Sequence, residues 1–571
     1  MLPAGGASLL RRPFFFRYGR RYFMTFKPRR IAALMAAASL FAVLPVTTAA
    51  APAPAGQTAA DVIPARTEGI GPFKRVVLRN VTMIDGTGAP AQGPFDIVIE
   101  NDRIAQIKSI GVPGAIDPTE RAAPGDQEMD LTGYYVMPGF VDAHVHLHSL
   151  SDSQKVPSDY ILKLWMAHGI TSVRDLGSGH PIEWLVDIKK RSERNEIVAP
   201  RIDIYPMFHQ IRGPVNDAAT ARAVIQEAKK RGADGIKFIG GAPEDVLYAA
   251  IDETKKQGLH STMHHAQQLV AYADVLDTSE AGLESMEHWY GLPEAMFTDK
   301  RVQSFPTDFI NNDEQMRFGE AGKLWAQTAE PGSDAWNKVM DTLLERKFVL
   351  DPTFTAYLTS RDFMRMSRAS WHDEYTMPAL WDFYRPSRVN HGAYWFDWTT
   401  EHEMAWKDNY RRWMRFVNDY KNRGGRVTIG SDAGYIYNLY GFGYIQEMEL
   451  MREAGFSSLE VIHAATQEGA RLLGHDDQVG TIRVGRKADL VVVKGNPLAN
   501  LKLLFGTGSV KLNDATGKVE RVGGVAYTIK DGIIYDAAKL RAEVRDMVAK
   551  SKAERGLPPG PMVIENAGTA N

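Results

Sequence analysis

The stretch from Val136 to Leu150, VMPGFVDAHVHLHSL, places three histidines at alternating positions soon after a Pro-Gly pair. Side chains at positions i and i+2 of a β-strand point to the same side, so His144 and His146 can converge on one point at the end of a strand. Paired imidazoles of this kind indicate a metal site. His148 lies beyond the expected strand end, and we interpret it as a loop residue or one that faces a substrate.

Seven further short apolar runs follow this strand before Gly474, and helix-forming stretches separate them. The runs are TSVRDLG, RIDIYPMF, GADGIKFIG, HSTMHHA, LESMEHW, FVLDPTF and RVTIGSDAG. Eight alternating β/α units predict an α/β fold, a (β/α)8 TIM-type barrel over residues 138–478. In such barrels the catalytic residues lie at the C-terminal ends of the strands.

Two β-rich patches flank the predicted barrel. VVLRNVTMIDGTG and FDIVIENDRIAQI lie before it, and GTIRVGRKADLVVVKGN and VAYTIKDGIIYDA lie after it. Runs of β-branched residues split by Gly and Pro are typical of short antiparallel strands. We expect residues 75–137 and 479–540 to form one small composite β-sandwich domain, with a linker at 51–74 and a C-terminal tail at 541–571.

The beginning of the chain has the features of a targeting segment. Arg29 and Arg30 precede the apolar run IAALMAAASLFAVL, which is too short to span a bilayer but suits the core of a signal peptide. The stretch RRYFM, residues 20–24, also loosely fits a twin-arginine export signal, and both routes stay open. We expect residues 1–50 to be a signal peptide with an N-terminal extension, and the protein to be exported to the periplasm or secreted.

Composition and charge narrow the classes of partner. Residues 1–49 hold eight Lys or Arg and no acidic residue, so without them the formal net charge changes from −2 to −10. A mildly acidic chain gives no electrostatic reason to expect nucleic acid or an anionic membrane as a partner. We expect a small-molecule substrate and no stable membrane insertion, and the composition is compatible with a homo-oligomer. Because the chain has no cysteine, a metal must be held by histidine, carboxylate or a rarer ligand, which favours zinc, manganese or iron.

The interval between the sixth and eighth predicted strands is unusually long. Its aromatic-rich insertion, at about residues 289–425, holds nine of the eleven tryptophans. Long insertions on a barrel often cap its mouth, so this segment is a candidate lid and substrate wall. Alternatively, the aromatic residues only pack the helices of the insertion itself.

Polar residues follow the predicted strands at the same end of the barrel. They are His144, His146, Lys237, His265, His288 and Asp432. Two divalent cations need about this many ligands, and Asp432 can also accept the proton of a bound water. A neutral Lys237 can react with CO₂ to give a carbamate, which is a carboxylate able to bridge two metals. His264 replaces His265 if the strand register slips by one, and His209 is a candidate for contacting substrate or an ordinary structural histidine.

This set of strand ends resembles the amidohydrolase superfamily over roughly residues 75–535, excluding much of the aromatic insertion. PGFVDAHVHLH resembles the opening signature, and TSVRDLG, GADGIKF, HA, MEHW and IGSDAG follow in the family's order. The lysine on the fourth strand is most similar to that of the imidazolonepropionase-like and dipeptidase-like binuclear enzymes. The resemblance implies that one metal is held by His144, His146 and Asp432, and the other by His265 and His288, with carboxylated Lys237 bridging them. Since the family motif places Ala directly after the ligand, it favours His265 over His264.

The resemblance implies a hydrolase that cleaves an amide-type C–N bond with a metal-activated hydroxide. We expect two divalent metal ions, with zinc as the expected metal, and a dipeptide, N-acyl amino acid or cyclic amide as substrate. Asp432 would pass the proton to the leaving amine. Esters, lactones and phosphotriesters need the same activated water and form the alternative substrate class. A non-catalytic ligand-binding relative is the alternative from another class, although such a relative is expected to lose ligands that this sequence keeps.

Overall fold

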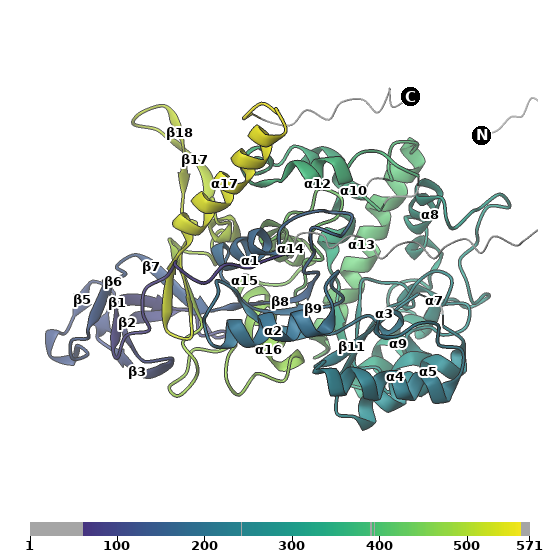
Figure 1. Ribbon diagram of the computed structural model, residues 1–571, viewed down its shortest axis with the longest axis horizontal. Helices are drawn as coiled ribbons and strands as arrows, with labels where there is room; N and C mark the ends of the chain where they lie inside the picture. The colour runs from purple at the N-terminus through teal and green to yellow at the C-terminus, as the bar shows by residue number, and fades with distance from the viewer. Residues whose placement is uncertain (1–60, 241, 389–390, 393, 561–571) are drawn as a thin grey trace, which may run out of the picture. The chain divides into compact units, whose positions relative to one another are not determined.

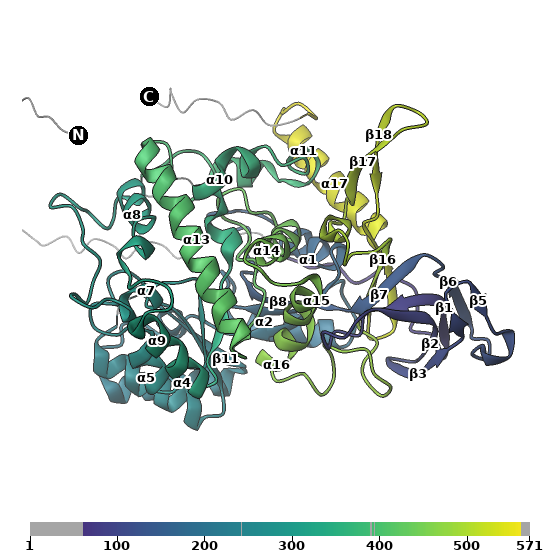
Figure 2. The same cartoon turned by 180° about the vertical axis from the view of Figure 1, so that it is seen from behind.

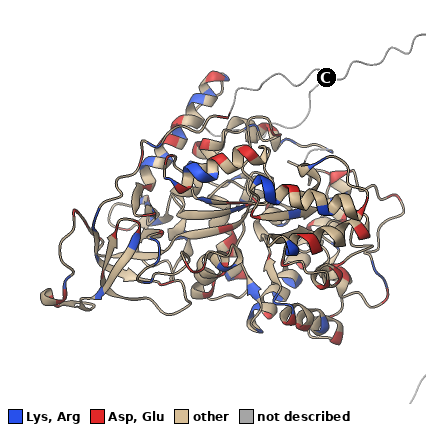
Figure 3. Cartoon of the chain, turned by 60° about the horizontal axis from the view of Figure 1, so that its bottom comes forward, with Lys and Arg blue, Asp and Glu red and all other residues tan. Residues whose placement is uncertain are grey.

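The computed structural model describes residues 61–240, 242–388, 391–392 and 394–560. The predicted signal peptide and extension, residues 1–50, lie outside this range, as do the first part of the predicted linker and residues 561–571. Within the described ranges, we find no helix with both the length and the hydrophobicity needed to cross a membrane. Figure 3 shows basic and acidic residues interspersed along the described helices.

Eight short strands form the parallel sheets of the structure, and all their pairings are parallel. They are β8 (Phe140–Val145), β9 (Ile170–Asp175), β10 (Arg201–Ile204), β11 (Gly235–Ile239), β12 (His260–His264), β13 (Ser285–Glu287), β14 (Val349–Asp351) and β15 (Arg426–Val427). Regular pairing gives two sheets, in the orders β10-β9-β8 and β11-β12-β13-β14-β15. The strands occur in the order in which the apolar runs of the sequence predicted them.

Backbone contacts link the two sheets at both seams. At one seam, Lys237 N donates to the carbonyl of Pro206 at 3.1 Å, and Met207 forms a parallel bridge with Lys237. At the other, Ala143 N donates to the carbonyl of Ile429 at 2.9 Å. The result is a TIM-barrel-like α/β arrangement, in which the strand ends that follow β8 and β15 are neighbours.

Helices follow most of these strands. They include α1 (Ser158–Ala167), α2 (Ile182–Glu193), α3 (Phe208–Ile211), α4 (Ala218–Arg231), α5 (Glu244–Lys256), α6 (Val275–Glu280), α14 (Phe442–Glu453), α15 (Ser458–His463) and α16 (Gly469–Leu472). Helix α4 shows how the sequence sets their ends. The Asp217 side chain accepts from Thr220 N at its start, and Gly232, with φ of 100°, ends it in the left-handed conformation that glycine favours.

Strands from both ends of the chain meet in one mixed sheet. Its order is β20-β19-β16-β7-β1-β2-β3, with β6 also paired to β1. The bounds are β1 (Val76–Met83), β2 (Gln92–Glu100), β3 (Arg103–Ser109), β6 (Gln127–Asp130), β7 (Tyr134–Pro138), β16 (Leu490–Lys494), β19 (Val525–Lys530) and β20 (Ile533–Asp536). Strand β7 pairs antiparallel with β16, from Tyr134 opposite Lys494 to Pro138 opposite Leu490. Figure 1 shows these purple and yellow strands side by side. A sandwich made from this sheet stays a prediction.

Two predicted boundaries differ from the structure. The linker is packed from its first described residue, since Asp61 accepts a hydrogen bond from the Ser158 hydroxyl at 2.6 Å and Ile63 is buried. The expected tail from residue 541 begins inside helix α17 (Ala537–Glu554), which packs against α1. One face of this helix is buried through Leu540, Val544 and Val548, which recur at helical spacing. Because this apolar face packs against the rest of the protein, the helix continues past residue 541.

Strand β14 divides the aromatic-rich insertion into two segments. Their helices are α7 (Leu292–Ala295), α8 (Glu314–Ala321) and α9 (Asp334–Glu345) before β14, and η3 (Phe354–Tyr357), α10 (Leu358–Ser367), α11 (His372–Tyr375), α12 (Pro378–Phe383) and α13 (Thr400–Asn422) after it. Trp289, Trp406 and Trp413 are fully buried, and the Trp289 ring lies 4.6 Å from that of Trp413. These tryptophans therefore pack the insertion itself, as the second alternative predicted. Figure 2 shows α13 running the length of this region.

Candidate metal centre

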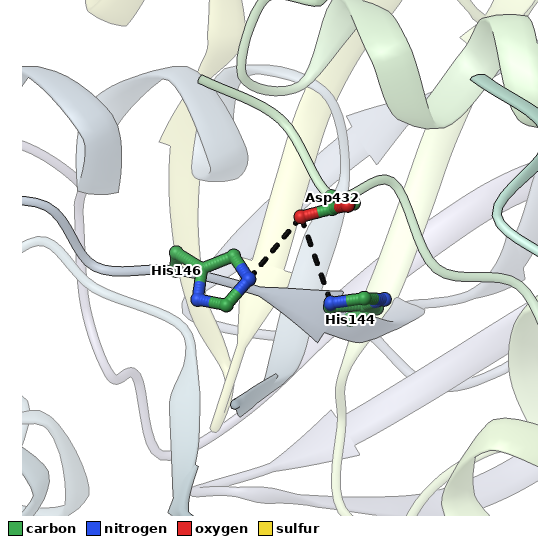
Figure 4. A group of neighbouring side chains, drawn as sticks. All are labelled: His144, His146 and Asp432. Carbon is green, nitrogen blue, oxygen red and sulfur yellow. Dashed lines mark ion pairs between the residues drawn. The ribbon is translucent and has the colours of Figure 1, made fainter. Parts of the chain in front are cut away.

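Two histidines and one aspartate meet where β8 and the chain after β15 end. Asp432 Oδ1 lies 3.5 Å from His144 Nε2 and 3.2 Å from His146 Nε2 (Figure 4). One possible ligand atom from each of these residues lies within 4.8 Å of the others. The structure thus brings together the three residues that the family resemblance assigns to one metal.

A third imidazole approaches the same carboxylate from β13. His288 Nε2 lies 3.4 Å from Asp432 Oδ2, and its Nδ1 shares a short hydrogen bond with the Thr353 hydroxyl. His146 Nδ1 contacts the carbonyl of Gly177 at 2.7 Å. A carbonyl only accepts, so the proton of this ring sits on Nδ1 and the Nε2 lone pair faces Asp432 when the ring is neutral.

The charge state of these rings suits a cation. Burial holds the pKa values of His144 and His288 well below the usual range, so both rings are neutral and can act as ligands. His146 differs, because Asp432 outweighs the effect of burial and raises its pKa. The negative charge of Asp432 can be balanced either by a proton on His146 or by a metal cation bound beside it. The donor set of neutral imidazoles and one carboxylate fits zinc, manganese or iron.

Lys237 points into the same cavity and is buried against Glu287. Lys237 Nζ and Glu287 Oε2 form a short ion pair, and Arg174 Nη2 lies 3.3 Å from Glu287 Oε1. Burial lowers the pKa of Lys237 despite the neighbouring carboxylate. Burial alone would raise the pKa of Glu287, but Lys237 and Arg174 outweigh it and hold the pKa down. Glu287 directly precedes His288 in MEHW, but the pattern of strand ends did not identify it.

The prediction for the fifth strand has to be corrected by one residue. His264, the last residue of β12, lines the cavity, and its ring centroid lies 4.8 Å from that of His288. His265 is fully buried behind the strand, where its Nε2 is 2.9 Å from the Thr278 hydroxyl. Successive strand residues point to opposite sides, so only one of the two can face the centre. The structure places His264 there.

Neither predicted substrate-contacting histidine lines the cavity. His148 is buried beside His146, and its Nδ1 lies 2.6 Å from the Tyr440 hydroxyl while its Nε2 lies 3.3 Å from the Tyr435 hydroxyl. His209 is exposed on α3. After the third strand, the residue that does line the cavity is Met207, two positions before His209.

The cavity has a volume of about 130 Å³ and a wall that comes partly from the insertion. Tyr357 and His391 line it, together with Tyr435 from the chain after β15. The Tyr357 ring stacks on Trp289 at 4.7 Å and 10° and on Trp406 at 5.6 Å and 23°. The insertion therefore combines both sequence alternatives, since its tryptophans pack internally and hold a tyrosine against the centre. No regular spacing in the sequence identifies Tyr357, His391 or Tyr435.

Comparisons with known proteins agree with this arrangement. The amidohydrolase family model matches residues 135–304 and 412–534. An adenine deaminase from Methanoculleus marisnigri is 29% identical over 189 residues, which cover 30% of this chain and 33% of the relative. A dihydroorotase from Thermoanaerobacter sp. is 28% identical over 157 residues, covering 27% and 33%. The chain thus spans about a third of the length of these curated relatives.

A solved structure shares the fold over a greater length. A Xaa-Pro dipeptidase with bound methionine aligns with a TM-score of 0.53 and 19% identity, over 81% of this chain and 100% of that one. The family model covers about half of the chain and includes His144, His146, Lys237, His288 and Asp432. From this match, and from the strand-end cluster, we conclude that the protein is a member of the amidohydrolase family.

Proposed function

We propose that the protein is a metal-dependent hydrolase of amide-type C–N bonds, with a dipeptide, N-acyl amino acid or cyclic amide as substrate. The observation that carries the proposal is the approach of three imidazole Nε2 atoms to the Asp432 carboxylate at the strand ends. The likeness in fold to a Xaa-Pro dipeptidase supports the dipeptide class. We also propose that the hydrogen bonds at both seams close the eight strands into one barrel, whose mouth is this centre.

The chain offers ligands for two divalent cations, and zinc is the metal that we propose. His144, His146 and Asp432 would hold one, and His264 and His288 the other. Bound there, divalent cations make hydroxide available near neutral pH and polarise a substrate carbonyl. The cavity of about 130 Å³ would also have to hold the two cations, so the substrate would place only a compact group at the centre.

Lys237 would join the two ligand sets as a carbamate. Its lowered pKa favours the neutral amine, which is the form that reacts with CO₂. The ammonium first loses a proton, and the amine then bonds to CO₂ and releases a second proton, so a group that would repel both cations becomes an anionic carbamate that would bind them. Glu287, which pairs with the ammonium form, would then depend on Arg174 and on the hydroxyl of Thr262, both of which already contact it.

Asp432 is the residue that moves the proton. Its carboxylate faces the cavity, and 14% of the side chain is accessible, more than for His144, His146 or His288. It can accept a proton from the attacking water and donate it to the leaving amine. A neutral amine leaves far more easily than an amide anion. Cleavage of the C–N bond therefore needs a proton donor beside the leaving nitrogen.

Tyr357 is placed to orient the substrate. Its ring is fixed between two tryptophans, and burial keeps its pKa well above the usual range, so the hydroxyl keeps its proton and can donate. A rigid donor beside the centre can bind the substrate carbonyl oxygen as charge develops on it. The buried tryptophans behind it keep water away from this side of the cavity.

For localisation we propose export to the periplasm or beyond. The support is the basic and apolar pattern of residues 1–50.

The function is tested by metal analysis and a substrate panel on the same protein. We expect about two metals per chain and hydrolysis of at least one dipeptide or N-acyl amino acid, with loss of turnover in Asp432→Asn. Hydrolysis of esters or phosphotriesters without amides would favour the alternative substrate class. Metal-free protein after incubation with zinc and bicarbonate would contradict the proposal and favour a ligand-binding relative.

A further inference from the structure

A second cavity, of about 430 Å³, lies between α10, α14 and the hairpin formed by β17 (Ser509–Asn513) and β18 (Lys518–Val522). Figures 1 and 2 show this hairpin projecting from the body of the molecule. The lining residues of this cavity and of the candidate metal centre do not overlap. Its volume falls in the range that holds small organic ligands.

One wall of this cavity is flat and aromatic. Trp371 is half-buried and stacks on Phe505 with ring centroids 5.3 Å apart and an interplanar angle of 26°. Trp371 also stacks on Phe442, at 5.0 Å and 18°. A Trp held in this way keeps one orientation, so it offers a fixed surface on which a planar ring can stack.

Two polar groups at this wall lack hydrogen-bond partners among the described residues. Gln446 on α14 lines the cavity and is 1% exposed, and its Oε1 has no such partner. The indole Nε1 of Trp371 also lacks a hydrogen-bond partner among the described residues. A buried polar group without a partner is destabilising, and a ligand that supplies a hydrogen bond to either group would remove this cost.

The rim of the cavity carries excess positive charge. Arg365, Lys502 and Arg521 line it, and Glu449 is the acidic residue among the lining set. Glu449 pairs with Lys502 and, at 3.4 Å, with Arg365. Arg521 donates to the Ser370 hydroxyl at 3.0 Å, which leaves its charge uncompensated within the lining set. Three cations and one carboxylate favour an anionic ligand.

We propose that this cavity is a second ligand site, which binds a small aromatic carboxylate that also carries an N–H or O–H donor. The ring stacks on Trp371, the carboxylate faces Arg521 and Lys502, and the donor meets Gln446. This proposal is independent of the hydrolase activity, because it uses none of the residues of the metal centre.

Indole-3-acetate is a suitable probe, because it combines a planar ring, one N–H donor and a carboxylate. Isothermal titration calorimetry on the full chain should show one saturable site. Arg521→Glu should weaken binding at least tenfold, and 3-methylindole, which lacks the carboxylate, should bind at least tenfold more weakly than indole-3-acetate. Lys511→Glu is the matched control, since it makes the same charge change on the opposite face of the same hairpin and should leave affinity unchanged.

A further variant separates this site from the metal centre. Asp432→Asn should bind indole-3-acetate as tightly as the unaltered protein does. The proposal is overturned if binding does not saturate, if Arg521→Glu binds normally, or if Asp432→Asn abolishes binding. The last result would place the probe at the metal centre and would leave the hydrolase proposal standing.

Discussion

Replacing either His264 or His265 by Ala tests which of two adjacent histidines holds the second metal. The two changes remove the same atoms from neighbouring positions of one chain segment, so each variant is the control for the other. His264 lines the cavity beside His288, whereas His265 is fully buried and contacts Thr278 at 2.9 Å. The structure therefore predicts opposite outcomes for metal content and stability.

The magnitudes follow from these contacts. His264→Ala removes one of two protein imidazoles from the second cation, so the metal content should fall from about two to about one per chain. His265→Ala should leave the metal content near two. It loses a hydrogen bond worth about 1 kcal/mol and leaves a cavity that costs about 2–3 kcal/mol, which together lower the free energy of unfolding by about 3–4 kcal/mol.

Elemental analysis after dialysis against zinc and bicarbonate measures the first effect, and thermal unfolding of the metal-free proteins measures the second. Metal-free protein is needed because bound metal itself stabilises the folded state. If His265→Ala loses metal while His264→Ala keeps it, the assignment of the fifth-strand ligand from this structure is wrong, and the family motif was the better guide.

Three further predictions concern the centre and the pH dependence of stability. Lys237→Ala should lower the metal content in elemental analysis, because it removes the proposed bridge; unchanged content would exclude the carbamate. Tyr357→Phe should reduce kcat/KM about a hundredfold with an unchanged Tm, since ring stacking remains; equal loss of both would mean a structural role. Burial lowers the pKa of His168 to about 3 and that of His372 to about 4. Below pH 6.5 these two histidines are protonated in the unfolded chain but stay neutral in the folded protein. The free energy of unfolding should therefore fall by up to about 1.4 kcal/mol per pH unit for each ring. Urea midpoints at pH 7 and 5 should differ less in the His168→Gln/His372→Gln double variant, and an equal difference would refute this cause.

Alternation along strands made much of the centre predictable. His144 and His146 share a face because they are two residues apart, and both Nε2 atoms reach Asp432 although their segments lie almost 290 residues apart in sequence. The order of polar strand ends also predicted Lys237 and His288 at the same cavity. These residues could be found because a parallel α/β fold brings the C-terminal ends of its strands to one edge.

The sequence pattern failed to identify some site residues, and each failure has a physical cause. His264 and His265 differ only in the face of the strand, and a one-residue difference in register cannot be read from composition. Glu287 was overlooked because its role depends on Lys237 and Arg174, which arrive from other strands. Tyr357 and His391 belong to irregular segments of the insertion, where no periodic pattern states which side chains face the cavity.

The pairing of β7 with β16 has a consequence for how the chain is made. Pro138 and Leu490 lie about 350 residues apart, yet they are opposite each other in the sheet. At a synthesis rate of about 5–20 residues per second, β7 waits roughly 20–70 s for its partner to be synthesised. During that time its edge can pair with other nascent chains, which is a known route to aggregation. Slower translation or a shortage of chaperones should therefore reduce the yield of folded protein more than the stability of the finished fold would indicate.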